Sequence, residues 1–271
     1  MIDLQGHAAL VTGSTKGVGR AIAEAFAEAG ADVVIHGRKA SEDSAAAVQR
    51  CAEFGVRTAF ITGDLSGPTE PSVDEVFQGA IEAMPEIDIL VNNAGTYLDK
   101  PFLEVDLETY QTMMRLNVAA PYFLTQRFAR RWIAHNVNGR VLMIGSINGR
   151  LAEQQHTIYD STKGAVEMMV KSLCVALAPY NIRVNGLAPG LVVTPLTSIL
   201  EEDADFKRWM CLHTPNGQVP GAEVCGEGAV YMVSDAARHV HGHMLMIDGG
   251  MSGWQQPDPP SGGWGAPTSS A

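Results

Sequence analysis

The stretch HAALVTGSTKGVGRAIAEAFAEAG, residues 7–30, decides the fold. Its apolar start is typical of a buried strand, and the recurrence of apolar residues after Val18 is typical of an amphipathic helix that ends at Gly30. Between the two lies TGSTKGVG, residues 12–19, whose three glycines permit positive φ angles and let a ligand approach the backbone. The free N–H groups and the positive dipole end of a helix attract phosphate. This strand, turn and helix therefore indicate a pyrophosphate-binding loop rather than a merely tight turn.

The remainder of the chain repeats this alternation of short apolar runs and longer amphipathic segments. Strands that are apolar throughout and separated by helices are typical of a parallel sheet covered on both faces. The sequence thus predicts an α/β fold, a Rossmann-type doubly wound seven-stranded parallel sheet with helices on both faces. We expect strands at 7–12, 31–37, 56–64, 87–95, 139–146, 182–190 and 243–250, and helices at 18–30, 41–55, 73–84, 107–135, 158–180, 196–212 and 221–234.

Two of these helices carry informative residues. Ser41 is the expected N-cap of the helix that follows it. The helix over 107–135 is expected to run through Pro121 without ending there.

We assign residues 1–251 to a single Rossmann-type catalytic domain and residues 252–271 to a Pro/Gly/Ser-rich C-terminal tail. The composition of the tail favours a disordered end. The alternative is an arm whose Trp254 and Trp264 dock on a neighbouring subunit or over a pocket.

The chain has 271 residues and a formal net charge of −11 at pH 7. A duplex-binding domain usually presents a basic face, so we expect no nucleic-acid partner. The cysteines stand apart, at Cys51, Cys174, Cys211 and Cys225, which favours free thiols in a reducing compartment. No run is apolar enough for a membrane helix, and no charged and then apolar leader precedes the first strand, so we expect a cytoplasmic protein and no membrane partner.

The second strand, ADVVIHG at 31–37, ends without the acidic residue that holds the 2′-hydroxyl of an NAD ribose. Asp32 lies at the wrong end of the strand, Gly37 stands where the acid would be, and Arg38 follows. Lys16 in the glycine loop adds a second cation, and two cations favour a 2′-phosphate. The sequence predicts NADP(H) as the preferred cofactor and NAD(H) as the other candidate. The alternative is that Arg38 and Lys39 are solvated loop charges.

Short motifs follow one another along the chain. They are TGSTKGVG at 12–19, GDL at 63–65, NNAG at 92–95, Asn117 in RLNVAAP, Ser146 in IGSING, YDSTK at 159–163, PGLVVT at 189–194 and IDGG at 247–250. Each is modest evidence by itself, but their common order is very specific. In these motifs the chain resembles the short-chain dehydrogenase/reductases over residues 3–251.

The resemblance implies a cofactor site built where the strands end. The glycine loop would hold the pyrophosphate, Asp64 the adenine amino group, and Thr194 with its neighbours the nicotinamide amide. The residues that it assigns to the cofactor are Gly13, Ser14, Thr15, Lys16, Gly17, Val18, Gly19, Arg38, Asp64, Leu65, Asn92, Ala94, Gly95, Tyr159, Lys163, Pro189, Gly190 and Thr194.

The stretch YDSTK places a phenol and an amine four residues apart, on one face of a helix. By itself such a pair is typical of an ordinary helix surface. Hydride transfer at a carbonyl, however, leaves charge on the oxygen, which needs a proton donor and a hydrogen bond. A nearby cation favours the phenolate and lowers a tyrosine pKa. We therefore expect Tyr159 to be the acid/base and Lys163 to lower the pKa of Tyr159 while it reaches the cofactor ribose.

Two polar residues complete the expected catalytic set. Ser146 ends the fifth predicted strand, where open α/β sheets bind their ligands, and its hydroxyl can donate to the substrate oxygen. The resemblance implies that Asn117 holds a water molecule that links Lys163 to solvent.

These observations predict an NADP(H)-dependent oxidoreductase that interconverts a secondary alcohol and a ketone. Candidate substrates are a 3-oxoacyl thioester, a sugar or polyol, and a small carbonyl compound. The alternative is a non-catalytic nucleotide-binding sensor or scaffold on the same fold, which would not need the Ser–Tyr–Lys–Asn set. Because the family commonly assembles through its two long helices, here about 107–135 and 157–179, the resemblance also implies a homotetramer or a dimer.

Three further features need structural evidence. HVHGH at 239–243 has no carboxylate or cysteine spaced to complete a site, so we expect no metal. His156 either lines the substrate pocket or caps the helix that carries Tyr159. The segment 196–215 is expected to close over the pocket, and four of its residues either wall that pocket or pack on the core: Leu196, Trp209, Met210 and Leu212.

Overall fold

The strands of the chain pair into one parallel sheet, as the sequence predicts. The computed structural model describes residues 2–253, and within them seven strands lie in the order β3-β2-β1-β4-β5-β6-β7. Every neighbouring pair is parallel. The expectations for Trp254 and Trp264 fall outside the described residues. The strands are β1 (Ala8–Val11), β2 (Asp32–Gly37), β3 (Thr58–Thr62), β4 (Ile89–Asn92), β5 (Arg140–Ile144), β6 (Arg183–Pro189) and β7 (Met244–Ile247).

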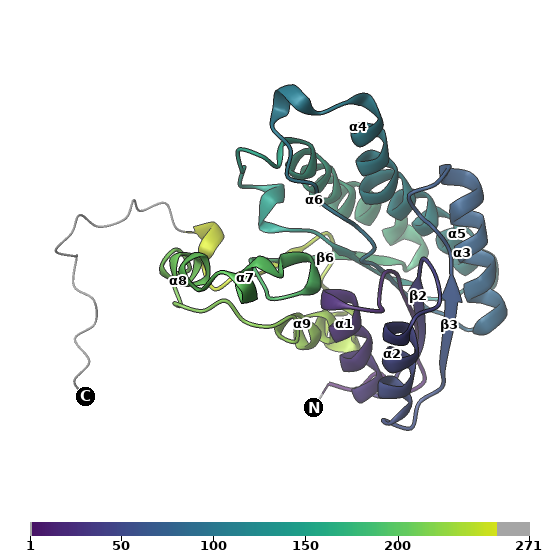
Figure 1. Cartoon of the computed structure of the whole chain (residues 1–271). Coiled ribbons are helices and arrows are strands. Elements are labelled where there is room, and N and C mark those ends of the chain that lie inside the picture. Colours follow the sequence, from purple (N-terminus) through teal and green to yellow (C-terminus); the bar gives the residue numbers. More distant parts are fainter. Residues whose placement is uncertain (1, 254–271) are drawn as a thin grey trace.

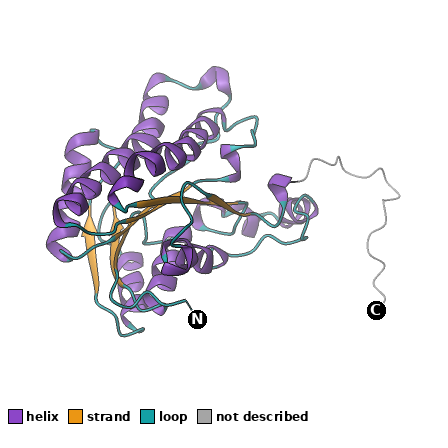
Figure 2. Ribbon diagram, turned by 180° about the vertical axis from the view of Figure 1, so that it is seen from behind, coloured by secondary structure: helices purple, strands orange, loops and turns teal. Residues whose placement is uncertain are grey.

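Helices cover both faces of the sheet, because each crossover between parallel strands must pass over one face or the other (Figure 1). Helices α1, α2 and α9 pack on one face, and α3, α5 and α6 on the other, so the sheet lies between two helical layers (Figure 2). The helices are α1 (Gly17–Glu28), α2 (Glu42–Ala52), α3 (Thr69–Ala83), α4 (Leu107–Met114), α5 (Ala120–His135), α6 (Thr157–Leu177), α7 (Ile199–Glu202), α8 (Ala204–Leu212) and α9 (Val224–Val233).

Each strand supplies alternate residues to two separate cores. In β1, Ala8 and Leu10 join the core beneath α3, α5 and α6, whereas Ala9 and Val11 join the core beneath α1, α2 and α9. This follows from the two-residue period of a strand, which turns successive side chains to opposite faces. The sheet is therefore buried on both sides, and its strands are apolar throughout.

The predicted helix over 107–135 is not a single α-helix. Residues Arg115–Ala119 form a π turn between α4 and α5, and Asn117 lies in its middle. Pro121 has no N–H to donate to the carbonyl of Asn117, four residues earlier, so regular α-helical bonding cannot continue there. π turns inside helices are frequent at functional sites.

Two other helix predictions have clear outcomes. Ser41 is the N-cap of α2 and accepts a hydrogen bond from the N–H of Ser44, as expected. The predicted helix over 196–212 is instead two short helices, α7 and α8, because Asp203 is extended and its carboxylate caps α8 through the N–H groups of Asp205 and Phe206.

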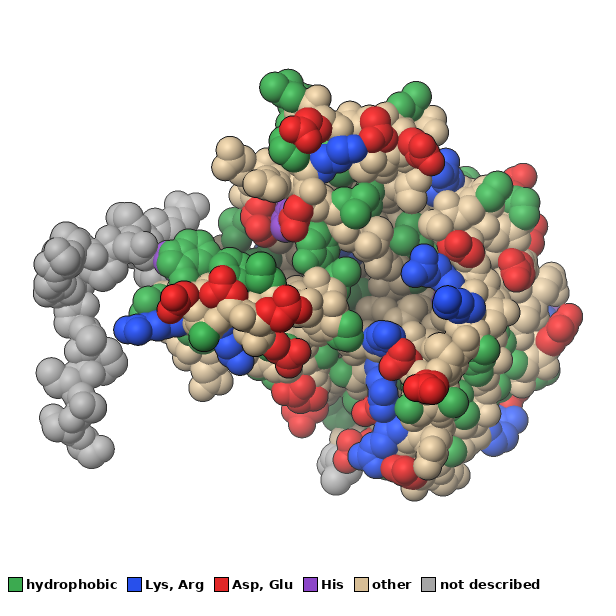
Figure 3. All heavy atoms as spheres, viewed as in Figure 1, with side chains coloured by type: hydrophobic (Ala, Val, Ile, Leu, Met, Phe, Trp, Pro, Cys, Tyr) green, Lys and Arg blue, Asp and Glu red, His purple; other side chains and the backbone are tan. Residues whose placement is uncertain are grey.

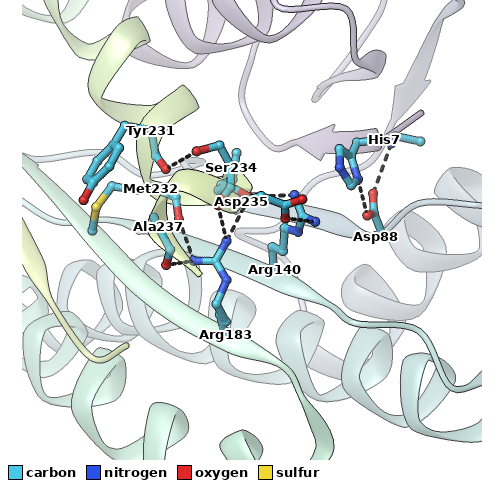
Figure 4. Close-up of polar contacts among 11 residues, drawn as sticks. His7, Asp88, Arg140, Arg183, Tyr231, Met232, Ser234, Asp235 and Ala237 are labelled. Atoms are coloured by element: carbon cyan, nitrogen blue, oxygen red, sulfur yellow. Dashed lines mark hydrogen bonds and ion pairs between the residues drawn. The ribbon is translucent and has the colours of Figure 1, made fainter. Parts of the chain in front are cut away.

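The C-terminal end of α9 is closed by one buried arginine from the start of β6. The Arg183 guanidinium donates hydrogen bonds of 2.9–3.0 Å to four backbone carbonyls, all drawn in Figure 4. The last carbonyls of a helix have no partner within the helix and carry the negative end of its dipole, so a cation there satisfies both needs. The carbonyls belong to Met232, Val233, Ser234 and Ala237.

We expect Arg183→Met to lower the free energy of unfolding by about 3 kcal/mol, because four carbonyls lose a charged donor. The Val233 carbonyl keeps its hydrogen bond from Arg140. Urea denaturation followed by circular dichroism measures this change. Arg130→Met, on the exposed side of α5, is the matched control and should stay within about 0.5 kcal/mol of the unsubstituted chain. Equal stability of the two variants would contradict this account of how α9 ends.

Candidate active site

The predicted site residues gather at the carboxyl edge of the sheet. Strand β1 lies between β2 and β4. The chain passes from β1 to β2 on one side, and after β3 it crosses back to form β4 on the other side of β1. At such a point the crossovers diverge and leave a crevice beyond the strand ends, where open α/β sheets bind ligands. The loops that follow β1, β4, β5 and β6 all reach this edge.

The glycine loop after β1 has the geometry of an anion site. Gly13 and Gly17 have φ angles of +62° and +55°, which other residues adopt rarely. A Cβ on Gly13 would lie 2.9 Å from the Cα of Ala94, so the backbones of the two loops touch. Helix α1 begins at Gly17 with no side-chain cap and no acidic residue in its first turn. Its first N–H groups are therefore available to an anion.

The inner side of this loop is tied to the sheet by Ser14 and His36. Ser14 is fully buried, its hydroxyl donates to the carbonyl of Val11 at 2.6 Å, and it accepts from the N–H of His36 at 3.0 Å. The Ser14 side chain is thus turned into the protein, and its N–H donates to the carbonyl of His36 at 2.9 Å.

His36 was not foreseen as a site residue, because a histidine within a strand carries no motif. Its Nδ1 accepts from the N–H of Gly13 at 3.0 Å, and its Nε2 lies 3.1 Å from the carbonyl of Gly63. These partners require the neutral tautomer with the proton on Nε2. Burial lowers the pKa of His36 to about 4, so the ring stays neutral at physiological pH.

The end of β2 has no space for a side chain. A Cβ on Gly37 would lie 2.8 Å from Cγ2 of Thr15. Lys16 is close by and pairs with Asp43 of α2 at 2.7 Å, with both side chains about half exposed, while Arg38 is exposed. An exposed ion pair contributes at most about 1 kcal/mol, so Lys16 can exchange Asp43 for an anionic ligand.

The loops after β3 and β4 differ in how they present their polar groups. One oxygen of Asp64 accepts from the N–H and the hydroxyl of Ser66, and these hydrogen bonds lower the pKa of Asp64. Leu65 is buried in the core. The Asn92 amide is also buried and donates to Thr125 of α5 at 3.0 Å, so its side chain is directed away from the glycine loop.

Asn93, rather than Asn92, contacts the glycine loop. Its amide donates to the carbonyls of Thr12 and Gly13 at 2.9 and 3.0 Å, and a Cβ on Gly19 would lie 2.3 Å from that amide nitrogen. The sequence does not show which of the two adjacent asparagines faces the glycine loop, because this depends on the residue at which β4 ends. Two other residues of this loop are predicted to bind the cofactor, Ala94 and Gly95. Ala94 lies against Gly13, and Gly95 lies so close to Asn117 that a Cβ on it would be 3.2 Å from the Asn117 side-chain oxygen.

The loop after β6 reaches the glycine loop from the other side. Pro189 ends β6, and the N–H of Gly190 donates to Ile247 of β7. A Cβ on Gly190 would lie 2.8 Å from Cα of Asp248, and one on Gly17 would lie 3.5 Å from Cβ of Thr194. The predicted residues on both loops are therefore brought together.

The four predicted catalytic side chains converge at the ends of β5 and α6. The Tyr159 side chain is partly buried, and its phenol lies close enough to the Ser146 side chain for the two to interact. The Lys163 ammonium lies 5.5 Å from the centre of the Tyr159 ring and donates to the carbonyl of Ile144 at 2.9 Å. The amide of Asn117 donates to the hydroxyl of Thr162 at 3.1 Å.

The electrostatics of this cluster correct one expectation. Burial raises the pKa of Tyr159 to about 12, and the hydrogen bond to Ser146 opposes that shift only in part. Burial also lowers the pKa of Lys163 to about 8. In the protein without ligands, the pKa of Tyr159 therefore lies above its ordinary value, because loss of solvent disfavours the phenolate.

Ser146 is oriented by a polar network that the sequence analysis missed. Its hydroxyl accepts from the N–H of Asn148 at 3.1 Å and donates to that side-chain oxygen at 3.3 Å. The Asn148 amide in turn donates to Glu153 and Asp160, both at 2.9 Å. An Asn two residues after a strand-ending Ser was the only signal in the sequence.

His156 lines the site and does not cap α6 with its side chain. Its ring lies 5.9 Å from the Tyr159 ring and 5.1 Å from the Tyr97 ring, and the Tyr97 hydroxyl donates to the carbonyl of Leu196 at 2.8 Å. Leu196 begins the segment 196–215, which we call the lid. Figure 3 shows a hollow between the lid and the helices above it.

The lid's large apolar side chains are not part of the core. Leu196, Trp209 and Leu212 are each at least half exposed, and Met210 is partly buried. The core-packing alternative is therefore wrong for the first three, and their exposure is consistent with a surface that contacts substrate or a partner.

The structure also bears on the expectations for metals, membranes and cysteines. Within residues 2–253, no group of three His, Cys, Asp or Glu side chains could hold a metal ion. Across the same residues, no helix has the length and hydrophobicity to cross a bilayer. The cysteines Cys51, Cys174, Cys211 and Cys225 are free, as expected.

The chain is similar to known proteins over most of its length. Residues 13–252 match the protein family described as enoyl-(acyl carrier protein) reductase. The chain is 34% identical over 250 residues to the 3-oxoacyl-[acyl-carrier-protein] reductase FabG of Aquifex aeolicus, covering 92% of this chain and 99% of that one. It is 32% identical over 253 residues to the L-rhamnose 1-dehydrogenase (NADP(+)) of Thermoplasma acidophilum, covering 93% and 98%.

A solved structure is similar over the same range. The gluconate 5-dehydrogenase from Burkholderia cenocepacia J2315, in complex with NADP and tartrate, has a TM-score of 0.85 at 34% identity, covering 93% of this chain and 98% of that one. On this evidence the chain belongs to the short-chain dehydrogenase/reductase family.

Proposed function

We propose that this protein is an NADP(H)-dependent oxidoreductase that interconverts a secondary alcohol and a ketone, with Tyr159 as the acid/base. The observation that carries the proposal is the proximity of the partly buried Tyr159 phenol to Ser146, beside Lys163, at the carboxyl edge of the sheet. The three relatives described above are named as reductases or dehydrogenases, which supports the same reaction class. Residues 1–251 form the catalytic unit.

The protein's own residues handle the proton and the oxygen. In carbonyl reduction, Tyr159 donates its proton to the substrate oxygen while Ser146 donates a hydrogen bond to it. In alcohol oxidation the phenolate accepts the proton from the hydroxyl. Lys163, which loses its charge near pH 8, exchanges protons with solvent through a water held at Asn117.

NADP(H) supplies the hydride acceptor or donor when it is bound. The chain fits this cofactor, because Gly13 and Gly37 leave cradles that a Cβ would fill and α1 offers uncapped N–H groups. The glycine loop would hold the pyrophosphate, Lys16 and Arg38 the 2′-phosphate, and Asp64 the adenine. Thr194, next to Gly17, would hold the nicotinamide end. NAD(H) would be the weaker cofactor, because Gly37 stands where an acid would hold the ribose 2′-hydroxyl.

The non-catalytic alternative is not supported. A sensor or scaffold needs the glycine loop but has no need for Tyr159 beside Ser146, and the network behind Ser146 and the Asn117–Thr162 hydrogen bond support a catalytic role. A buried polar network that served no purpose would be costly to keep.

We expect Tyr159→Phe to lower kcat for carbonyl reduction by about 10³-fold, because the proton donor is lost, while NADPH still binds. Nicotinamide absorbance measures the rate and NADPH fluorescence measures binding. Tyr231→Phe, on α9, is the control and should leave both unchanged. Normal turnover in Tyr159→Phe would contradict the mechanism.

In the unsubstituted chain, the rate of carbonyl reduction should stay constant through neutral pH, since a pKa of about 12 keeps the phenol protonated. The rate of alcohol oxidation should rise with pH as the phenolate forms.

We expect Arg38→Asp to lower the ratio of kcat/KM for NADPH over NADH by at least about tenfold, since a cation that faces the 2′-phosphate becomes an anion. Steady-state kinetics with both cofactors measures this ratio. Arg238→Asp makes the same charge change at the opposite edge of the sheet and should leave the ratio unchanged. If Arg38→Asp also left it unchanged, Arg38 would be a solvated loop charge.

We propose that the chain assembles into a homotetramer, or a dimer, through the helices α4–α5 and α6. Large apolar side chains on these helices face solvent in the single chain, and Met168 and Val175 lie seven residues apart on one face of α6. Exposed apolar patches of this kind mark protein interfaces. The others are Leu107, Tyr110, Tyr122 and Ile133.

We expect Met168→Asp combined with Val175→Asp to yield a smaller species, because two buried charges would oppose association. Light scattering coupled to gel filtration measures the mass. Ala46→Asp, on the exposed side of α2, is the control and should keep the mass of the unsubstituted protein. A monomeric unsubstituted protein would refute the assembly.

We also propose the cytoplasm as the compartment of this protein. The proposal rests on its four free cysteines, which an oxidising compartment would tend to pair or modify.

A further inference from the structure

The wall of the site beside Tyr159 is made by a histidine between two carboxylates. His156 Nε2 contacts the carboxylate of Asp99, which follows β4, and its Nδ1 lies 3.3 Å from a carboxylate oxygen of Glu153, which precedes α6. The side chain of His156 is only 15% exposed, whereas those of Asp99 and Glu153 are 62% and 58% exposed. The imidazole is therefore mostly buried, whereas the two carboxylates are accessible to solvent or to a ligand.

This wall offers many hydrogen-bond acceptors and few donors. A carboxylate has about four lone-pair sites, yet Asp99 has one side-chain partner among the described residues, His156, and Glu153 has Asn148 and the nearby imidazole. A ligand that satisfies the remaining sites must supply several O–H or N–H donors. The ring of Tyr97, edge-on to His156, adds an apolar surface in the same wall.

The local charge is negative and not balanced by nearby cations. Lys100 is paired with Asp106 at 2.5 Å, and Arg150 with Glu167 at 3.0 Å. The negative field reaches the catalytic phenol, because Glu153 is among the groups that raise the pKa of Tyr159, after burial.

The lid carries four acids and two basic residues, and Figure 3 shows acidic and basic side chains on its outer side and apolar side chains along the edge that faces the hollow. The negative charge beside Tyr159 therefore comes from Asp99 and Glu153. The lid residues are Glu201, Glu202, Asp203, Asp205, Lys207 and Arg208.

We propose that the wall of Asp99, Glu153 and His156 selects uncharged polyhydroxylated substrates, namely alditols or aldoses, and disfavours substrates that carry a carboxylate or phosphate. The proposal rests on the oxidoreductase function proposed above. Hydroxyl groups supply the donors that the two carboxylates lack, and an anionic group there meets like charges without a counter-ion. Sugar acids and coenzyme A thioesters, although their chemistry suits the same reaction, belong to the disfavoured class.

Matched compounds that differ in one group test the selection. D-Glucitol and D-gluconate share a carbon skeleton but differ in charge at C1, as do D-galactitol and D-galactonate, and xylitol and D-xylonate. With NADP⁺ and the unsubstituted protein, we expect kcat/KM for the best alditol or aldose to exceed that of its acid by at least about tenfold. The preference should shrink as ionic strength rises, because salt screens the repulsion.

Two conservative substitutions test the residues. Asp99→Asn combined with Glu153→Gln removes both charges and keeps their size, and it should narrow the alditol-to-acid ratio by about tenfold, chiefly through faster turnover of the acid. Glu82→Gln, on α3 at the amino edge of the sheet, removes one exposed acid far from the site and should leave the ratio unchanged.

Several outcomes would overturn the selection. A higher kcat/KM for the sugar acid or for acetoacetyl-coenzyme A than for the best alditol or aldose would overturn it. So would an alditol-to-acid ratio that is the same in the double variant and the unsubstituted protein. Much faster turnover of the cationic 1-amino-1-deoxy-D-glucitol than of D-glucitol would also overturn it. Turnover of cyclohexanone with NADPH but of no polyhydroxylated compound would also overturn it, while leaving the proposed function standing. Failure of the proposed function is distinct, because Tyr159→Phe would then match the unsubstituted chain on every substrate.

Discussion

The close approach of the Gly13 backbone to Ala94 is the constraint on which the site depends. It can form only where the sheet order reverses direction around β1, because there the loops after β1 and β4 are neighbours without belonging to one crossover. The hydroxyl of Thr12 accepts from the N–H groups of Asn93 and Ala94 and so fixes the distance between the loops. With that distance set, no side chain is tolerated at position 13, and the first turn of α1 is left facing the crevice.

Much of the architecture could be predicted, because it depends on local pattern. Apolar strands alternating with amphipathic helices determined the seven-stranded parallel sheet, and the glycine spacing located the anion loop. What could not be predicted depends on contacts between distant segments. The burial of Ser14 depends on His36 of the next strand, and the choice between Asn92 and Asn93 depends on where β4 ends. The π turn at Asn117 could have been anticipated from Pro121, but a proline within a helix can also produce a kink or an end.

Burial, more than charge, sets the resting state of the catalytic cluster. The sequence places an amine beside a phenol and so favours the phenolate, but removal of both groups from water favours the neutral form of each. The resting protein therefore holds Tyr159 as a phenol, which is the form that donates a proton. Asn148 both donates a hydrogen bond to the Ser146 hydroxyl and accepts one from it, so the hydroxyl beside the phenol has a fixed position.

His36 makes the anion loop sensitive to acid in a way that the catalytic residues are not. Its ring is neutral when folded, with a pKa of about 4, and would hold a proton more readily once exposed, with a pKa of 6.5. Between these two values the unfolded chain binds more protons, so stability is lost as the pH falls through this window. Protonation of Nδ1 would also remove the acceptor for the Gly13 N–H. One source of acid sensitivity in this protein therefore lies inside β2, at a residue that touches neither the substrate nor the hydride but holds the cofactor loop.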